Sequence, residues 1–259
     1  GITQDITVRC QDKQMYHFYM LAQLGGTVSE VVEISFGASP SAEVVLKGEV
    51  QGIMYESLAG ALVRAEGNPG STVKLLQDIS ISETIDIGSQ ADYTIDLNGK
   101  TVTAIYNDEL YKTIFSLDRG AVLTMRDSVG GGKVDGDCKY PNVQKLFDLK
   151  YSAVLVIQSG IFSEKAGTIG GTAGDLKIEG GTFYNKVNVG YFKYVLTGGK
   201  FAGELNSGST VGNILARGYR YRDLTTGEDV SAEMLRAESI QNVEVYVLPS
   251  IGGTVTLTG

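Results

Sequence analysis

Residues that commonly build metal and redox sites are scarce in this sequence, which has two cysteines and one histidine in 259 residues. Neither Cys10 nor Cys138 belongs to a CxxC motif, so a zinc site is not expected. Whether the two thiols form a disulfide stays open, because sequence spacing alone does not bring distant cysteines within bridging range. His17 stands in MYHFYM without nearby acidic or cysteine partners, and we interpret it as a strand residue.

Positive charge, proline and long apolar runs are also limited. Lys and Arg number 22 against 30 Asp and Glu, and the net charge of −8 disfavours binding to nucleic-acid phosphates. No apolar run reaches the ~18 residues that a membrane-spanning helix needs, so no membrane span is expected. Four prolines stand against 34 glycines, a balance typical of many tight turns between strands rather than of disorder.

A short repeated phrase is the most informative feature that the sequence does have. The stretches AVLVIQSGIF, DLKIEGGTF and YVLTGGKF each place an apolar residue three positions before a glycine and five before a phenylalanine. These apolar residues, Ile157, Ile178 and Leu196, follow one another at intervals of 21 and 18 residues. A repeat of ~20 residues predicts a solenoid, in which one strand-bearing unit stacks on the next.

Two segments nearby extend the pattern. IFSLDRGAVLTM (114–125) and LFDLKYSAVLVI (146–157) align residue for residue at a spacing of 32, and DSVGGGKVDGDCKYPN (127–142) is interpreted as a loop pushed out of one turn. The glycine of each repeat is where the chain should bend out of a strand, and the phenylalanine should start the next strand. Alternation predicts which side chains face the core. The inward positions are Leu123, Met125, Leu155, Ile157, Leu176 and Ile178, and the outward ones are Thr124, Arg126, Val156, Gln158, Lys177 and Glu179.

These patterns predict an all-β fold, namely a right-handed parallel β-helix, because crossovers between parallel strands are right-handed in ~98% of cases. A helix is expected over 55–66 with Ser57 as N-cap, where it would cover the open first coil. The C-terminal segment is expected to include NVEVYVL as an edge strand. The expected units are a small β-rich lead-in module at 1–52, the capping helix and turn at 53–70, the parallel coils at 71–208 and the C-terminal cap at 209–259.

Four longer stretches carry a resemblance to a known group of proteins: YESLAGALVRAEGNPGSTVKLLQDISIS, YTIDLNGKTVTA, IEGGTF and LARGYRYRDLTTGE. Over residues 53–247 the chain resembles repetitive extracellular proteins of Gram-positive gut bacteria. The resemblance implies a right-handed parallel β-helix of the pectin-lyase-like kind, and a secreted or cell-wall-attached bacterial location. It implies no catalytic residues, because most members of the group have no assigned reaction.

A carbohydrate-active enzyme is the alternative interpretation, since this fold often hosts polysaccharide lyases and glycoside hydrolases. Such enzymes need acids that hold calcium beside a base, or two or three carboxylates facing one cleft. No two stacked outward positions are both acidic, and the polygalacturonase motifs NTD, Asp-Asp, GHG and RIK do not occur. The sequence therefore favours a non-catalytic extracellular module, structural or adhesive, whose partner is a glycan or a cell-surface protein.

Two groups of residues are candidates for ligand binding. Tyr184, Tyr191 and Tyr194 belong to an aromatic-rich C-terminal third without tryptophan, where exposed rings are able to stack on sugar faces. Arg126 and Glu179 occupy outward positions of the predicted coils. The alternative for the tyrosines is that they fill the last coil and its cap.

The densest acidic cluster consists of Asp127, Asp135 and Asp137, beside Arg126. Carboxylates and backbone carbonyls of this segment are able to hold a calcium ion. The alternative is a solvated Gly/Asp turn, which the residue types favour because glycine and aspartate dominate turns for backbone reasons. No other cofactor is expected, and the sequence does not indicate an oligomeric state.

Overall fold

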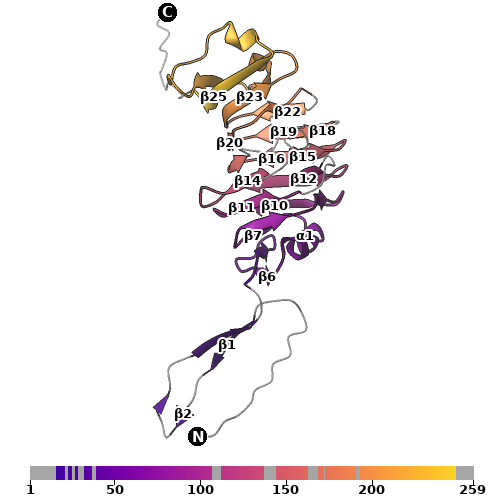
Figure 1. Cartoon of the computed structure of the whole chain (residues 1–259), viewed down its shortest axis with the longest axis vertical. Coiled ribbons are helices and arrows are strands. Elements are labelled where there is room, and N and C mark those ends of the chain that lie inside the picture. The colour runs from indigo at the N-terminus through magenta and orange to yellow at the C-terminus, as the bar shows by residue number, and fades with distance from the viewer. Residues whose placement is uncertain are drawn as a thin grey trace, which may run out of the picture.

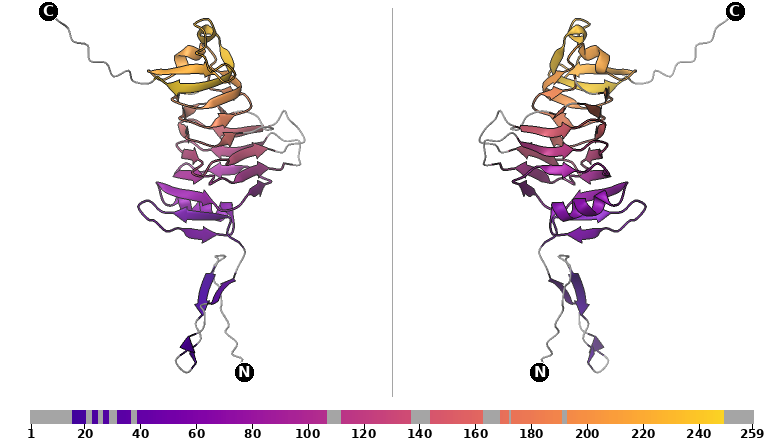
Figure 2. Two further views of the ribbon diagram at one scale, coloured as in Figure 1. Left: turned by 90° about the vertical axis from the view of Figure 1, so that its left-hand side faces the viewer. Right: turned by 90° about the vertical axis from the view of Figure 1, so that its right-hand side faces the viewer.

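The structure is a computed structural model of the chain. It describes residues 39–106, 112–136, 144–162, 169–171, 173–190 and 193–248, together with the strands β1 (Tyr16–Met20), β2 (Gln23–Leu24), β3 (Thr27–Val28) and β4 (Val32–Phe36). β1 pairs with β4 and β2 pairs with β3, both antiparallel. From β5 onward, short strands stack in layers along one long axis (Figures 1 and 2).

Three sheets form the stacked body. The first contains, in spatial order, β22 (Lys193–Leu196), β19 (Gly174–Ile178), β16 (Ala153–Ile157), β13 (Val122–Arg126), β10 (Asp92–Asp96), β7 (Ser71–Leu75), β5 (Ala42–Val45) and β6 (Ile53–Tyr55). The second contains β24 (Tyr219–Asp223), β25 (Ser239–Val247), β23 (Lys200–Asn206), β20 (Thr182–Phe183), β17 (Ile161–Phe162), β14 (Lys133–Gly136), β11 (Thr101–Ala104) and β8 (Ile79–Ile81), with β21 (Val187–Asn188) beside β23. The third contains β18 (Ile169–Gly171), β15 (Gln144–Leu149), β12 (Lys112–Leu117) and β9 (Ile85–Ile87).

The chain enters these sheets in a fixed order. β7 lies in the first sheet, β8 in the second and β9 in the third, and β10 then returns to the first sheet, parallel to β7. The same sequence of visits repeats for the strand triplets that begin with β10, β13 and β16. Each coil therefore adds one strand to each sheet, which is the stacked topology that the short repeat predicts.

Stacking in register places like side chains above one another. Leu123 is level with Leu155, which in turn is level with Leu176. The predicted alignment of the two segments spaced by 32 residues is confirmed in the third sheet, where Phe115 is level with Phe147. The side chains predicted to face inward are all fully buried: Leu123, Met125, Leu155, Ile157, Leu176 and Ile178.

A ladder of phenylalanine rings fills one corner of the later coils. Phe162, Phe183 and Phe201 are buried, one in each of β17, β20 and β23. Successive ring centroids lie 5.1 and 5.0 Å apart, and the ring planes differ by 16° and 8°. The prediction that the phenylalanine of each repeat begins a new strand is confirmed.

The helix expected over 55–66 is present as α1 (Leu58–Glu66), and the Ser57 hydroxyl accepts a hydrogen bond from the amide of Gly60. Its predicted apolar face is buried and consists of Leu58, Ala61, Leu62 and Ala65. α1 lies against β5, β7 and β10, on the first-sheet side of the first coil. β5 pairs antiparallel with β7, so part of the segment expected as a lead-in module belongs to the first sheet.

The C-terminal segment adds antiparallel strands to the second sheet, with the turns η1 (Val211–Ile214) and η2 (Met234–Arg236) between them. β25 pairs with β23 on one side and with β24 on the other. The expectation that NVEVYVL is an edge strand is therefore wrong, and β24 is the edge. Local alternation identifies the strand, but it does not reveal that β25 inserts between two strands that precede it in the chain.

The loop predicted over 127–142 is also partly wrong, because it contains β14, which pairs with β11 and β17. Val134 is the only strongly β-forming residue of this strand, so its position is set by backbone pairing to its neighbours. Cys10 and Cys138 lie outside the described residues. Within the described ranges, no helix has the length and apolar character needed to cross a bilayer.

Candidate functional site

A groove of about 590 Å³ follows the turns that carry the chain from the first sheet into the second. Successive coils contribute equivalent turns, so the groove runs along the stack, and β24 and β25 close its C-terminal end. Its lining consists of Asp127, Gly130, Gly131, Ser159, Gly160, Ile161, Glu179, Gly180, Gly181, Thr182, Thr197, Gly198, Gly199, Lys200, Tyr219, Glu244, Val245, Tyr246 and Val247.

Glycines form the floor of the groove for a steric reason. Gly181 and Gly199 have φ angles of +93° and +107°, a backbone conformation that side chains rarely allow. A Cβ at Gly180 would lie 2.2 Å from the carbonyl oxygen of Gln158, and one at Gly198 would lie 2.0 Å from that of Glu179. The coils approach too closely here for any side chain, so the floor is made of glycine backbone, which is partly exposed at Gly180 and Gly181 and buried at Gly198 and Gly199.

Polar side chains stand along this floor. Thr182 and Thr197 occupy successive coils and are half-buried. The Ser159 hydroxyl accepts a hydrogen bond from the Asp127 amide at 2.7 Å and donates to the Asp127 carbonyl at 3.1 Å, which ties two adjacent turns together. Glu179 accepts a hydrogen bond from the Gln158 amide at 3.2 Å. In the strand register, Gln158, Glu179 and Thr197 are equivalent residues of successive coils, so polar groups of different kinds follow one another along the groove.

Charged pairs and a tyrosine mark the C-terminal end of the groove. Arg222 donates to Glu244 at 2.7 Å, and Lys200 Nζ lies 4.0 Å from the other oxygen of that carboxylate. The Arg222 guanidinium also lies over the Tyr246 ring, 4.9 Å from its centroid. The Tyr246 hydroxyl donates to Asp229, and this bond raises the pKa of Tyr246 and, together with Arg220, lowers the pKa of Asp229.

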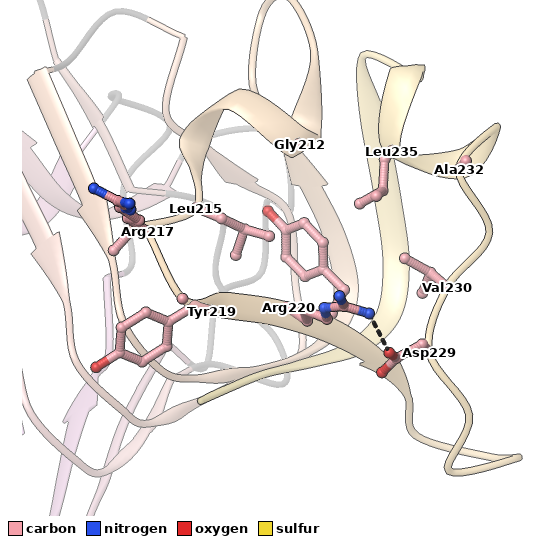
Figure 3. A pocket seen from close by; sticks show the side chains of 12 residues that line it. Gly212, Leu215, Arg217, Tyr219, Arg220, Asp229, Val230, Ala232 and Leu235 are labelled. Atoms are coloured by element: carbon pink, nitrogen blue, oxygen red, sulfur yellow. Dashed lines mark hydrogen bonds and ion pairs between the residues drawn. The ribbon is translucent and has the colours of Figure 1, made fainter. Parts of the chain in front are cut away.

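A second hollow of about 560 Å³ adjoins the groove in the C-terminal segment and is lined by residues between Gly212 and Leu235. Figure 3 shows Leu215, Val230 and Leu235 around it, with Arg220 reaching toward Asp229 at its rim. The Arg220–Asp229 ion pair spans 3.0 Å. The remaining lining residues are Gly212, Ala216, Arg217, Gly218, Tyr219, Tyr221 and Ala232.

Two tyrosines, Tyr219 and Tyr221, line this hollow. Tyr221 is buried in the wall and donates a hydrogen bond to the Val211 carbonyl at 3.0 Å. Burial raises the pKa of Tyr221, so its phenol stays neutral. Tyr219 lines both the groove and this hollow, so the two concavities are neighbours.

The ligand-binding residues expected from the sequence do not gather at one place. Glu179 lies in the groove, whereas Arg126 holds the buried Asp96 carboxylate at 3.0 Å. Tyr184 follows β20 with 44% of its surface exposed, and Tyr194 lies in β22, partly packed against the core. Tyr191 lies outside the described residues.

The acidic residues expected to hold calcium have other partners. Asp127 accepts hydrogen bonds from the amides of Gly99 at 2.7 Å and Gly132 at 2.6 Å, one on each carboxylate oxygen. Asp135 is buried in β14 and forms an ion pair with Lys133 at 3.0 Å. Asp137 lies outside the described residues, and among those described no three His, Cys, Asp or Glu side chains gather as metal ligands. Calcium binding here stays a prediction.

The groove, with its glycine floor and the polar side chains beside it, was not predicted as a site from the sequence. The signal was present in the repeated SG and GG pairs, which indicate bends but do not show that stacked bends leave a groove. No family model matches the chain, and neither a curated protein nor a solved structure matches it. The site is therefore interpreted from its own geometry.

Proposed function

We propose that this chain is a non-catalytic extracellular module, secreted or attached to the bacterial cell wall, that binds an extended glycan along the glycine-floored groove. It would serve in adhesion or as a structural spacer at the cell surface. The proposal includes a right-handed winding of the coils and a capping role for α1, in keeping with the resemblance to pectin-lyase-like proteins. The one-strand-per-sheet order of the coils supports it, because parallel crossovers are strongly biased to the right hand.

The observation that carries the proposal is a row of polar side chains, contributed by successive coils, along a floor of glycine backbone. An extended polymer of similar units requires similar contacts at regular steps, and stacked parallel strands supply steps of about 4.8 Å. Thr182 and Thr197 present hydroxyls from successive coils at two different positions of the coil, because Thr182 is level with Lys200. Hydroxyls donate hydrogen bonds to sugar hydroxyls and also accept them. Tyr219 and Tyr246 add aromatic surface at one end.

The carboxylates of the groove favour binding over turnover. A glycoside hydrolase needs two carboxylates free to act on opposite sides of one bond. Here Asp127 accepts from two backbone amides, Glu244 is paired with Arg222, and Glu179 accepts from Gln158. These groups are committed to holding the turns and the cap together.

A glycan array probed with the full chain tests the proposal, together with assays for new reducing ends and for unsaturated uronate products. The test variant is the double substitution Thr182→Val and Thr197→Val, which removes two groove hydroxyls at nearly constant volume. Its matched control is Thr94→Val and Thr124→Val, a stacked pair on the outer face of the first sheet. We expect the groove variant to lose about thirtyfold in affinity, since it removes two hydrogen bonds that contribute about 1 kcal/mol each, and the control to bind normally.

Three results would contradict the proposal. Turnover of any polysaccharide would show that the module is an enzyme. An array without hits would show that the chain binds none of the glycans on it. Equal losses in the groove variant and in its control would place the binding surface elsewhere.

A further inference from the structure

Within the described ranges, the N-terminal end of the stack is covered over the first sheet only. The first sheet continues beyond β7 through β5 and β6. In contrast, β8 pairs only with β11 and β9 pairs only with β12 in the described part of the chain. α1 packs on β5, β7 and β10, so it covers the first-sheet side, and no other described strand pairs with the outer edges of β8 and β9.

The backbone of these two strands directs hydrogen-bonding groups toward the open end. The carbonyls of Ile81 and Ile87 accept from Ile105 and Asp118 of the next coil, at 2.8 and 2.9 Å. Alternate residues of a strand point their amides and carbonyls to opposite sides. Ser80 and Asp86 therefore turn their backbone groups away from the stack, as at any sheet edge that is able to accept another strand.

A cavity of about 420 Å³ lies beside these edges, between α1 and the chain from β8 to β9. Its larger apolar lining residues are Leu58, Leu62, Val63, Ile81, Ile85 and Tyr93. Val63 is 73% exposed, although the buried face of α1 is directly beside it. An extended segment along β8 and β9 would thus meet apolar side chains as well as backbone partners.

The charged side chains that line this cavity are all acidic. Glu66, Glu83 and Asp86 line it, and no Lys or Arg does. None of the three forms an ion pair with a residue in the described ranges. The Glu66 carboxylate lies against the coil edge, because a Cβ added at Gly88 would fall 1.7 Å from its Oε1. An occupant with positive charge complements this surface.

We infer that the N-terminal end of the stack binds an extended peptide in which Lys or Arg alternates with apolar residues, added as a strand along β8 and β9 beside α1. Main-chain hydrogen bonds to an exposed sheet edge give affinity in such complexes, and pockets for alternate side chains give specificity. Here the apolar side chains would enter the cavity, and the cations would face Glu66, Glu83 and Asp86. This site lies at the end of the stack opposite the C-terminal cap and is independent of the glycan proposal.

A short capped peptide that alternates Lys and Val is the probe, measured by calorimetry with the full chain. We expect saturable binding that protects the amides around β8 and β9 from hydrogen exchange. The same peptide with Glu in place of Lys should not bind. A version N-methylated at alternate residues should also fail, because it keeps the charge but loses one row of strand hydrogen bonds.

Charge-reversed variants locate the interaction. Glu83→Lys with Asp86→Lys should weaken binding by about tenfold, since two exposed contacts with the cations of the peptide are replaced by repulsion. The matched control is Glu228→Lys with Glu233→Lys, two exposed residues of the C-terminal cap, which should bind as the parent does.

Four results would overturn the inference. These are the lack of peptide binding, equal binding of the N-methylated peptide, and exchange protection confined to residues outside β8 and β9. The fourth is concentration-dependent self-association that protects the same strands without peptide, which would assign the edge to a second copy of the chain.

Discussion

Replacement of the middle ring of the phenylalanine ladder should be the most destabilising single change in the later coils. Phe183 is 1% exposed and lies between the rings of Phe162 and Phe201. Phe→Ala substitutions in cores typically cost about 3–5 kcal/mol. Each stacked ring pair adds about 0.5–1.5 kcal/mol beyond burial, so Phe183→Ala should fall near the upper end, at about 4–5 kcal/mol. Native domains are stable by only about 5–15 kcal/mol.

Urea unfolding of the full chain, with comparison of the slope as well as the midpoint, measures this loss. Phe183→Leu is the matched variant, because it keeps most of the apolar volume and removes both ring contacts. Apart from the loss of the two stacked ring contacts, Phe183→Leu should reduce the free energy of unfolding by less than about 1.5 kcal/mol. Because each coil contacts only its neighbours, hydrogen exchange should show the largest loss of protection in β17, β20 and β23. A cost below about 2 kcal/mol for the alanine variant, or equal costs for the two variants, would refute the reasoning.

Two further predictions concern the groove floor and the cap. Gly198→Ala should destabilise the folded chain by about 1–3 kcal/mol, because the added Cβ would lie 2.0 Å from the Glu179 carbonyl oxygen. Thermal unfolding measures this loss, and the control is Gly67→Ala, whose Cβ would meet nothing closer than 3.9 Å. Hydrogen bonds from the backbone amides of Thr226 and Thr225 lower the pKa of Asp223. The ionised Asp223 therefore stabilises the fold above its unfolded pKa of about 3.9, and this stabilisation is lost as the pH falls through the lower folded pKa. Asp223→Asn should therefore reduce the drop in urea midpoint between about pH 5 and about pH 3, and an unchanged drop would contradict this assignment.

The coil interior could be predicted from the sequence because the same physical rule acts on every coil. Leu123, Leu155 and Leu176 alternate with polar residues, and only one face of a strand packs inward, so their burial follows from local pattern alone. Ser57 and the apolar face of α1 followed from capping and helical spacing for the same reason. These features depend on residues close together in the chain.

The elements that the sequence did not reveal depend on distant backbone. β14 has a single strong β-former, Val134, and exists as a strand because β11 and β17 supply hydrogen bonds on both sides. The place of β25 between β23 and β24 is likewise a property of pairing. The groove arises from the close approach of Gly198 to the Glu179 carbonyl one coil below, a distance that no local pattern encodes.

The close packing at Gly180 and Gly198 also decides where the chain is able to change in length. Three residues separate β16 from β17, β19 from β20, and β22 from β23. On the opposite corner, the stretch from the second sheet to the third has three residues between β8 and β9 but seven between β11 and β12 and between β14 and β15. Insertions, whether natural or engineered as display sites for foreign peptides, should therefore be best tolerated at that corner, because the number of residues there already differs from coil to coil.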